Sequence, residues 1–284
     1  MLNKLLALNR PLIMGIVNVT PDSFSDGGKF LSTAAAIAHA IKLIEEGADI
    51  LDIGGESTRP GAPSVRLDEE LSRVMPVIES LRGTHPHVAL SIDTQKTPVM
   101  QAAINAGVAM VNDVNALRDE GALMACAHGD VTVCLMHMQG KPQTMQQAPQ
   151  YGDVVSEVSA FLRARADAAI AAGIQAHRIV LDPGLGFGKS LAHNLALLGG
   201  VNQIVVIGYP VLIGASRKSI FKALLNREVD DRLVPSVVAA LYAAGEGAKI
   251  LRVHDVRETR DALTMTEALV NATAERSAEA SLKS

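Results

Sequence analysis

The stretch IKLIEEGADILDIG, residues 41–54, contains one complete junction between a helix and a strand. An amphipathic segment ends at Gly47, where a helix C-cap needs the positive φ that glycine adopts readily. The apolar run 49–54 follows and is typical of a buried strand. We therefore predict a helix over 33–47 and a strand over 49–54. Gly107, Gly173 and Gly247 mark the same kind of junction later in the chain.

The same unit repeats along the whole sequence. Short apolar runs alternate with amphipathic segments rich in Ala and Leu, which indicates repeated βα units. The expected strands are 12–17, 49–54, 88–92, 109–114, 131–136, 178–182, 210–215 and 249–254. The expected helices are 33–47, 68–82, 97–106, 120–128, 153–173, 191–199, a divided segment of 217–226 plus 234–245, and 256–273. Eight strands in one domain predict an α/β fold, a single-domain (β/α)8 TIM barrel, rather than an open doubly wound sheet.

Composition narrows the class of protein. The chain has 284 residues, 48% hydrophobic and 20% charged, with a net charge of −4, which argues against disorder and membrane spanning. No Gly/Ser/Pro linker divides it, so we expect one domain over 1–284, with a flexible tail over about 273–284, where apolar periodicity is lost. The absence of a Lys/Arg tract and an aromatic content of only 3% argue against a nucleic-acid partner.

The cysteines and the N-terminus indicate a cellular compartment. Cys126 and Cys134 are separated without a C-x-x-C pattern, as expected for a reduced chain. Arg10 and Pro11 interrupt the short apolar N-terminal stretch, and no small-residue cleavage site follows. We therefore expect neither a signal peptide nor a membrane partner, and a cytoplasmic location.

Polar side chains stand at the end of every expected strand. They are Asn18, Asp52, Asp93, Asn112, Asp113, His137, Asp182, Ser216, Arg217, Lys218, Arg252, His254 and Asp255. The C-terminal ends of barrel strands face one mouth, where active sites form, so this set predicts the site. We interpret Asp52, Asp113 and Asp255 as supporting or capping groups, because a carboxylate after a strand often caps a helix or forms a turn.

The residue types at the mouth predict a ligand with two different ends. Arg252, His254 and Lys218 suit a phosphate or pyrophosphate. Asn18 offers an oxygen for Mg²⁺ bridged to such phosphates. Asp93, Asp182 and Asn112 supply acceptors for the guanidine-like edge of a flat heterocycle. The ligand is therefore predicted to be small and charged.

Two motifs are misleading. The stretch DPGLGFGKS, 182–190, has Pro183 where a phosphate loop needs Gly and Lys189 where G-x-G-x-x-G needs Gly, so a nucleotide site is not favoured. Its glycines are expected to let the backbone approach a flat ligand, with Phe187 exposed between them. His137 in LMHMQ, 135–139, is interpreted as structural, because no H-x-H or H-E-x-x-H partner supports a transition metal.

Long motifs in a fixed order identify a resemblance. NVTPDSFSDGG (18–28), GGESTRPGA (54–62), SIDT (91–94), NDV (112–114), CLMHMQG (134–140), LDPGLGFGK (181–189), SRKS (216–219) and RVHDV (252–256) closely resemble the dihydropteroate synthase family. The resemblance implies a homodimeric (β/α)8 transferase that requires Mg²⁺. It implies condensation of 6-hydroxymethyl-7,8-dihydropterin pyrophosphate with 4-aminobenzoate, which gives 7,8-dihydropteroate and pyrophosphate in folate biosynthesis.

The resemblance also implies roles for individual residues. Pterin contacts are implied for Asp93, Asn112, Met136, Asp182 and Lys218. Pyrophosphate contacts are implied for Asn18, Arg252 and His254, with Asn18 also the metal ligand. The 4-aminobenzoate neighbourhood is Phe24, Thr58, Arg59, Pro60, Phe187 and Ser219, and the catalytic group is Asp93, Lys218, Arg252 and His254. No extra residue beside Phe187 crowds the pocket, so inhibition by sulfonamides, which mimic 4-aminobenzoate, is expected.

The first long motif, 18–28, is expected to act as a flap over the mouth that excludes water when ligand binds. The rival functions are weaker. A pterin-binding methyltransferase would have no pyrophosphate to stabilise, and a pterin-binding protein without catalysis would be expected to lose the loop motifs that stand complete here. A phosphate-binding aldolase would need a Schiff-base lysine at a strand end, whereas Lys218 is expected at the start of a helix.

Overall fold

A computed structural model of the protein describes residues 2–19, 28–57, 61–140 and 144–282. In these residues the parallel strands form one sheet of eight, in the order β6-β5-β4-β3-β2-β1-β8-β7. The strands are β1 Leu12–Asn18, β2 Ile50–Gly54, β3 Ala89–Asp93, β4 Met110–Asp113, β5 Thr132–Met136, β6 Ile179–Asp182, β7 Leu212–Ile213 and β8 Ile250–Val253. All eight expected strands are therefore confirmed.

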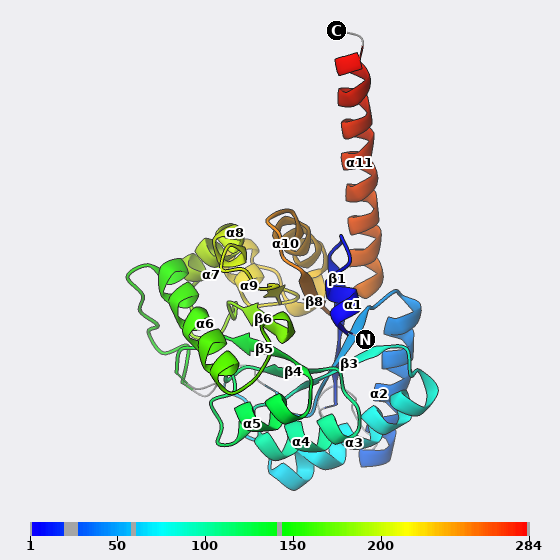
Figure 1. Ribbon diagram of the computed structural model, residues 1–284, viewed down its shortest axis with the longest axis vertical. Helices are drawn as coiled ribbons and strands as arrows, with labels where there is room; N and C mark the ends of the chain where they lie inside the picture. The colour runs from blue at the N-terminus through cyan, green and yellow to red at the C-terminus, as the bar shows by residue number, and fades with distance from the viewer. Residues whose placement is uncertain (1, 20–27, 58–60, 141–143, 283–284) are drawn as a thin grey trace.

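Helices surround the sheet (Figure 1). They are α1 Leu2–Leu6, α2 Gly28–Glu45, α3 Leu67–Thr84, α4 Thr97–Asn105, α5 Ala122–His128, α6 Val154–Ala171, α7 Leu191–Gly199, α8 Val201–Val205, α9 Ile220–Leu225, α10 Leu233–Gly245 and α11 Val256–Leu282, with short 3-10 turns at Ala176–Arg178 and Val229–Asp231. The divided segment after β7 is confirmed as α9 and α10. The short helices α1 and α8 were not predicted, because so few residues carry little periodic signal.

The sheet closes into a barrel through β6 and β7. A single bridge joins Leu181 to Val211, and Leu181 N donates to Pro210 O at 2.9 Å. β7 is much shorter than its apolar run 210–215, and at the start of that run Pro210 has no N–H to donate to a ladder. The predicted (β/α)8 barrel is thus confirmed, with its weakest joint at β7.

Strand alternation sorts the apolar side chains into two groups. One group packs between the strands and the surrounding helices and includes Ile13, Leu51, Leu90, Val111 and Val133. The other fills the inside of the barrel near the N-terminal ends of the strands: Leu12, Met14, Ile50, Ala89, Met110, Cys134, Val180, Leu212 and Ile250, with Leu2 of α1. α1 therefore caps the N-terminal end of the barrel, which is filled with side chains rather than open.

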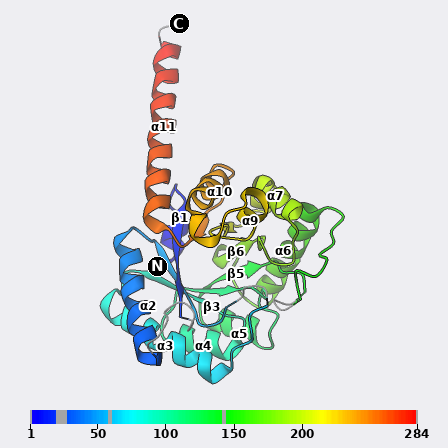
Figure 2. The same ribbon diagram turned by 180° about the vertical axis from the view of Figure 1, so that it is seen from behind.

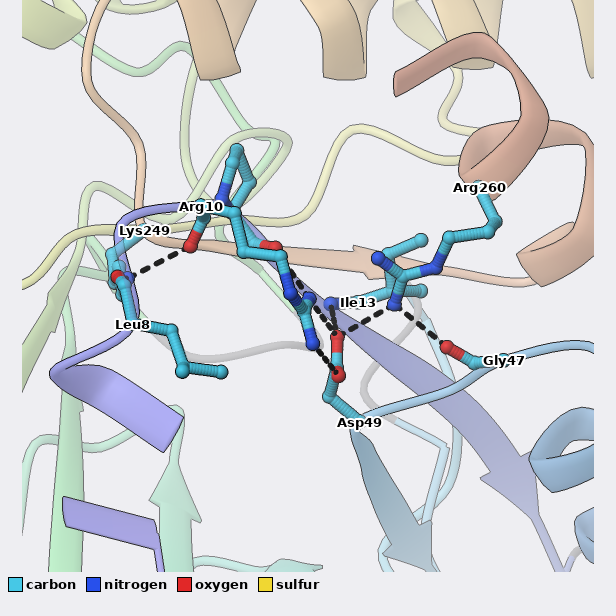
Figure 3. Close-up of polar contacts among 8 residues, drawn as sticks. Leu8, Arg10, Ile13, Gly47, Asp49, Lys249 and Arg260 are labelled. Atoms are coloured by element: carbon cyan, nitrogen blue, oxygen red, sulfur yellow. Dashed lines mark hydrogen bonds and ion pairs between the residues drawn. The ribbon is translucent and has the colours of Figure 1, made fainter. Parts of the chain in front are cut away.

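A charged cluster ties this end together (Figure 3). Asp49 accepts from Arg10 Nη2 at 2.7 Å and from Arg260 Nη2 at 2.7 Å. It also accepts from the Ile13 backbone N–H at 2.9 Å. Lys249 Nζ donates to the carbonyl of Arg10 at 2.8 Å. One carboxylate thus joins the segment before β1 to β2 and α11.

The last helix, α11, was predicted to end at 273 but is helical to Leu282. Figures 1 and 2 show its C-terminal part projecting beyond the barrel. The segment TAERSAEASL is rich in Ala and Glu, which favour helix without an apolar stripe. The flexibility of this end stays a prediction. None of the described helices combines the length and the apolar character that crossing a bilayer requires.

Candidate active site

The inside of the barrel changes from apolar to polar toward the C-terminal ends of the strands. Side chains two residues apart on a strand point to the same face, so Asp52 lies above Ile50 and Arg252 above Ile250. Asp52 stands in register with Ser91, and Asp93 with Asn112. A layer of polar side chains therefore rests directly on the apolar filling of the barrel.

Arg252 is the centre of this layer. Its Nε donates to Asp52 Oδ2 at 2.6 Å, and its Nη2 donates to Asp93 Oδ2 at 2.6 Å. Asn112 Nδ2 donates to the same Asp52 oxygen at 2.9 Å. Asp52 is fully buried and orients both neighbours, which agrees with its interpretation as a supporting group. Among the described residues, Asp52 Oδ1 and Ser91 Oγ are buried without a hydrogen-bond partner.

Burial shifts the pKa of the groups in the mouth. It raises the pKa of Asp93 to about 7, although the Arg252 charge acts in the opposite direction. It also raises the pKa of Asp182, which Lys218 opposes. Burial lowers the pKa of Lys218 to about 8, against the attraction of Asp182. Asp93 and Lys218 therefore change charge near neutral pH, which is common in active sites.

The glycine-rich segment after β6 forms one wall of the mouth. Gly184 N donates to Asp182 Oδ1 at 2.7 Å, and Lys218 Nζ donates to the Leu185 carbonyl and lies 4.8 Å from the centre of the Phe187 ring. A Cβ on Gly184, whose φ is +68°, would lie 1.9 Å from the His137 carbonyl oxygen. The close approach is thus to a neighbouring backbone. Phe187 is half-buried rather than exposed, and it packs against a cluster of Val114, Met136, Met138 and Met145.

His137 is structural, as predicted, and its partner is a lysine that the sequence analysis missed. Lys189 Nζ lies 3.0 Å from His137 Nδ1 and donates to the Phe187 carbonyl at 2.9 Å. Burial lowers the pKa of Lys189 to about 7 and, with the Lys189 charge, lowers the pKa of His137 to about 3. The only signal in the sequence was a lysine beside a glycine-rich turn.

The segments after β7 and β8 are joined at the rim. Ser216 Oγ lies 3.0 Å from His254 Nδ1 and accepts from the His254 backbone N–H at 3.2 Å. Arg217 Nε donates to Asp255 Oδ2 at 3.1 Å, so Asp255 is a supporting group. Asp113 accepts from Asn115 N at 2.7 Å and forms a turn, as predicted.

The structure gathers most of the predicted site residues at one mouth. Arg252 joins Asp93 to Asp52, and Asp52 in turn accepts from Asn112. Asp182, Lys218, Met136 and Phe187 line the adjoining wall. Asn18 ends β1 in register with Gly54, and Ser219 immediately precedes α9. The predicted residues Phe24, Thr58, Arg59 and Pro60 lie outside the described residues.

Comparison with known proteins identifies the family. The sequence pattern of the family described as pterin binding enzyme matches residues 14–254, and the dihydropteroate synthase of Haemophilus influenzae is 49% identical over 270 residues, 95% of this chain and 98% of that protein. The chain belongs to the dihydropteroate synthase family. Its function is that of a dihydropteroate synthase, a pterin-binding transferase of folate biosynthesis.

Solved structures of dihydropteroate synthase have the same fold. The Xanthomonas albilineans enzyme with 4-aminobenzoic acid has a TM-score of 0.87 and 54% identity, covering 92% of this chain and 93% of that one. The Yersinia pestis enzyme in a sulfonamide drug complex has a TM-score of 0.87 and 46% identity, covering 92% and 95%. The barrel and its family thus agree with the resemblance that the motifs indicated.

Proposed function

We propose that the polar mouth condenses 6-hydroxymethyl-7,8-dihydropterin pyrophosphate with 4-aminobenzoate and releases 7,8-dihydropteroate and pyrophosphate. The observation that carries this proposal is the buried layer in which Arg252 joins Asp52 to Asp93. A flat heterocycle with several N–H donors fits such a layer, because buried acceptors need donors and exclude ligands that lack them. The Xanthomonas relative, solved with 4-aminobenzoic acid, supports the second substrate.

The pterin is assigned to Asp93, Asn112, Asp182 and Lys218, with Met136 packed against the ring. Asp93 and Asp182 present carboxylates to the N–H groups of the ring. Lys218 lies close enough to Asp182 to influence its pKa, so the lysine balances that buried charge. The pterin therefore enters a pocket whose charges are already paired and oriented.

Pyrophosphate is assigned to Asn18, Arg252 and His254, with Mg²⁺ as cofactor. Within the described part of the chain, no three His, Cys, Asp or Glu side chains gather to hold a metal by themselves. A single side-chain oxygen, that of Asn18, fits Mg²⁺. This ion commonly takes one or two protein oxygens and completes its shell with phosphate oxygens and water. Bound there, the ion would neutralise part of the pyrophosphate charge.

The residues of the chain favour loss of pyrophosphate before attack by the amine. An aryl amine is a weak nucleophile, so breaking the bond between the methylene carbon and the pyrophosphate oxygen is the main barrier. The bonding pair leaves with pyrophosphate, where Arg252 and His254 stabilise its charge. Asp93 stabilises the positive charge that develops on the pterin. The amine nitrogen then bonds to the methylene carbon and loses a proton to solvent.

The 4-aminobenzoate site is assigned to Phe187 and Ser219, together with Phe24, Thr58, Arg59 and Pro60. Phe187 offers a half-buried ring beside Lys218, as a benzoate with an aromatic face and a negative charge requires. The sulfonamide complex of the Yersinia relative supports inhibition of this protein as well. Sulfonamides should compete with 4-aminobenzoate, and undiminished turnover at saturating sulfonamide and limiting 4-aminobenzoate would contradict this.

We further assign a homodimer in the cytoplasm. Val234, Val238 and Tyr242 lie at four-residue spacing on α10 and are 70%, 59% and 48% exposed, which is unusual for side chains of this size. Both cysteines are buried and unpaired, in keeping with a reducing compartment. Analytical ultracentrifugation should find a dimer that Val238→Glu converts to monomer, whereas a monomer at micromolar concentration would refute the assignment.

One assay tests the reaction itself. Purified protein should release pyrophosphate and form dihydropteroate only when the pterin pyrophosphate, 4-aminobenzoate and Mg²⁺ are all present. Release of pyrophosphate without 4-aminobenzoate would mean that water, rather than the amine, captures the pterin after the pyrophosphate has left. Methyl transfer from a reduced folate, with no pyrophosphate release, would instead support the methyltransferase alternative.

A further inference from the structure

One carboxylate joins the two ends of the segment 55–66, which connects β2 to α3. Glu56, near its beginning, accepts at Oε1 from the backbone N–H of Val65, near its end, at 3.2 Å. The Gly55 carbonyl accepts from Arg73 Nη1 at 2.6 Å, so the first residue is also held against α3. The positions 58–60, assigned above to 4-aminobenzoate, fall between the two ends that Glu56 connects.

A lysine that follows the neighbouring strand, β3, completes the cluster that holds these two ends. Lys96, between β3 and α4, forms ion pairs with both Glu56 and Glu70, and its Nζ lies 2.5 Å from Glu70 Oε2. The side chains of Glu56, Glu70 and Lys96 are only 9%, 0% and 22% exposed. Ion pairs shielded from water to this degree hold their geometry far better than those on the surface.

The same cluster reaches the pterin pocket. Thr94, the residue after Asp93, donates from Oγ1 to Glu70 Oε1 at 2.6 Å, and Lys96 N donates to Thr94 Oγ1 at 3.2 Å. α3 and α4 lie side by side outside β3 in Figures 1 and 2. Burial acts to lower the pKa of Lys96, but Glu56 and Glu70 hold it above its ordinary value, so the lysine stays charged.

We propose that Lys96 is a positioning residue for 4-aminobenzoate. By pairing with Glu56 and Glu70, it fixes both ends of segment 55–66 beside the end of β3. Restricting the ends of a binding segment lowers the conformational entropy lost when the ligand binds. Lys96 touches neither substrate and acts through Glu56. The inference rests on the proposed function, through the role given to residues 58–60.

Steady-state kinetics with both substrates varied tests this role. Lys96→Met should raise KM for 4-aminobenzoate at least fivefold and leave KM for the pterin pyrophosphate within twofold. Lys96→Arg keeps the charge and should restore most of the affinity. Glu56→Gln leaves Lys96 paired with Glu70 and buries no unpaired charge. It should also raise KM for 4-aminobenzoate. Lys42→Met, which removes an exposed lysine of α2 that is paired with Glu46, is the matched control and should change neither constant.

Limited trypsin digestion gives a readout that needs no activity. Arg66 is exposed at the end of the segment, and trypsin does not cut the Arg59–Pro60 bond. The rate of cleavage after Arg66 therefore reports how firmly the ends of segment 55–66 are held. Lys96→Met should accelerate this cut severalfold, and Lys96→Arg should not. Equal increases in both KM values, or an unchanged cleavage rate, would overturn the proposal. A wild-type protein that makes no dihydropteroate would refute the proposed function instead. The digestion would still test whether Lys96 holds the ends of segment 55–66.

Discussion

Asp93 and Arg252 form an ion pair in the polar layer of the mouth. If Asp93 stabilises positive charge on the pterin during the loss of pyrophosphate, Asp93→Asn should lower kcat on the order of 100-fold, because a fixed charge aimed at a transition state contributes several kcal/mol. Quench-flow measurement of bound substrate turnover isolates this step. Asp182→Asn is the comparison, and we expect it to raise KM for the pterin substrate more than it lowers kcat.

Full turnover by Asp93→Asn with altered affinity alone would show that the carboxylate only binds the ring.

The titration of two buried residues predicts how activity depends on pH. Burial raises the pKa of Asp93 to about 7 and lowers the pKa of Lys218 to about 8. In the proposed mechanism the Asp93 carboxylate is ionised and Lys218 is protonated, so kcat/KM should rise as pH increases through 7 and fall above 8. Lys218→Arg should remove the upper limb, because arginine stays protonated. An upper limb that persists in Lys218→Arg would assign that titration to another group.

At the scale of elements, the wall of the mouth depends on close contact between two strand–helix connections. Gly184→Ala would place a Cβ 1.9 Å from the His137 carbonyl oxygen, in a backbone region that costs L-residues about 1 to 2 kcal/mol. We expect a fall in Tm of several degrees together with weaker pterin binding, measured by calorimetry. Gly208 has φ +101°, and a Cβ added there would meet nothing within 4 Å apart from its chain neighbours. Gly208→Ala therefore carries backbone strain without the clash and should lower Tm less.

Equal losses of Tm in the two variants would mean that the contact with His137 relaxes without cost.

At the scale of the whole molecule, the barrel separates stability from catalysis. Asp49 joins Arg10, Arg260 and the Ile13 N–H at the end of the barrel opposite the mouth. Asp49→Ala leaves these donors without their acceptor and should lower the free energy of unfolding by about 2 kcal/mol, less than for a fully buried pair. Urea unfolding and kcat/KM measure the two properties separately, and kcat/KM at 25 °C should not change.

Glu228→Ala, which removes an exposed partner of Lys222, is the control and should leave both nearly unchanged. A large loss of kcat/KM in Asp49→Ala would show that the two ends of the barrel are coupled.

Repeated patterns in the sequence predicted the fold most fully. Apolar runs such as 49–54 and glycines such as Gly47 fixed the number, order and approximate bounds of the strands, because periodicity and capping are local properties of the chain. The polar residues at strand ends followed from the barrel, since all strands end at one face. The long motifs identified the family. These features needed no knowledge of contacts.

Only the tertiary structure decided how the polar residues are paired. Asp52 and Arg252 are 200 positions apart, and their hydrogen bond exists only because β2, β1 and β8 are neighbours in the barrel. Lys189 beside His137, and Lys96 between Glu56 and Glu70, likewise join separate strand ends. The sequence by itself determined which side chains reach the mouth. Barrel closure and burial determined which of them share a charge, because the strength of such pairs depends on distance and on exclusion of water.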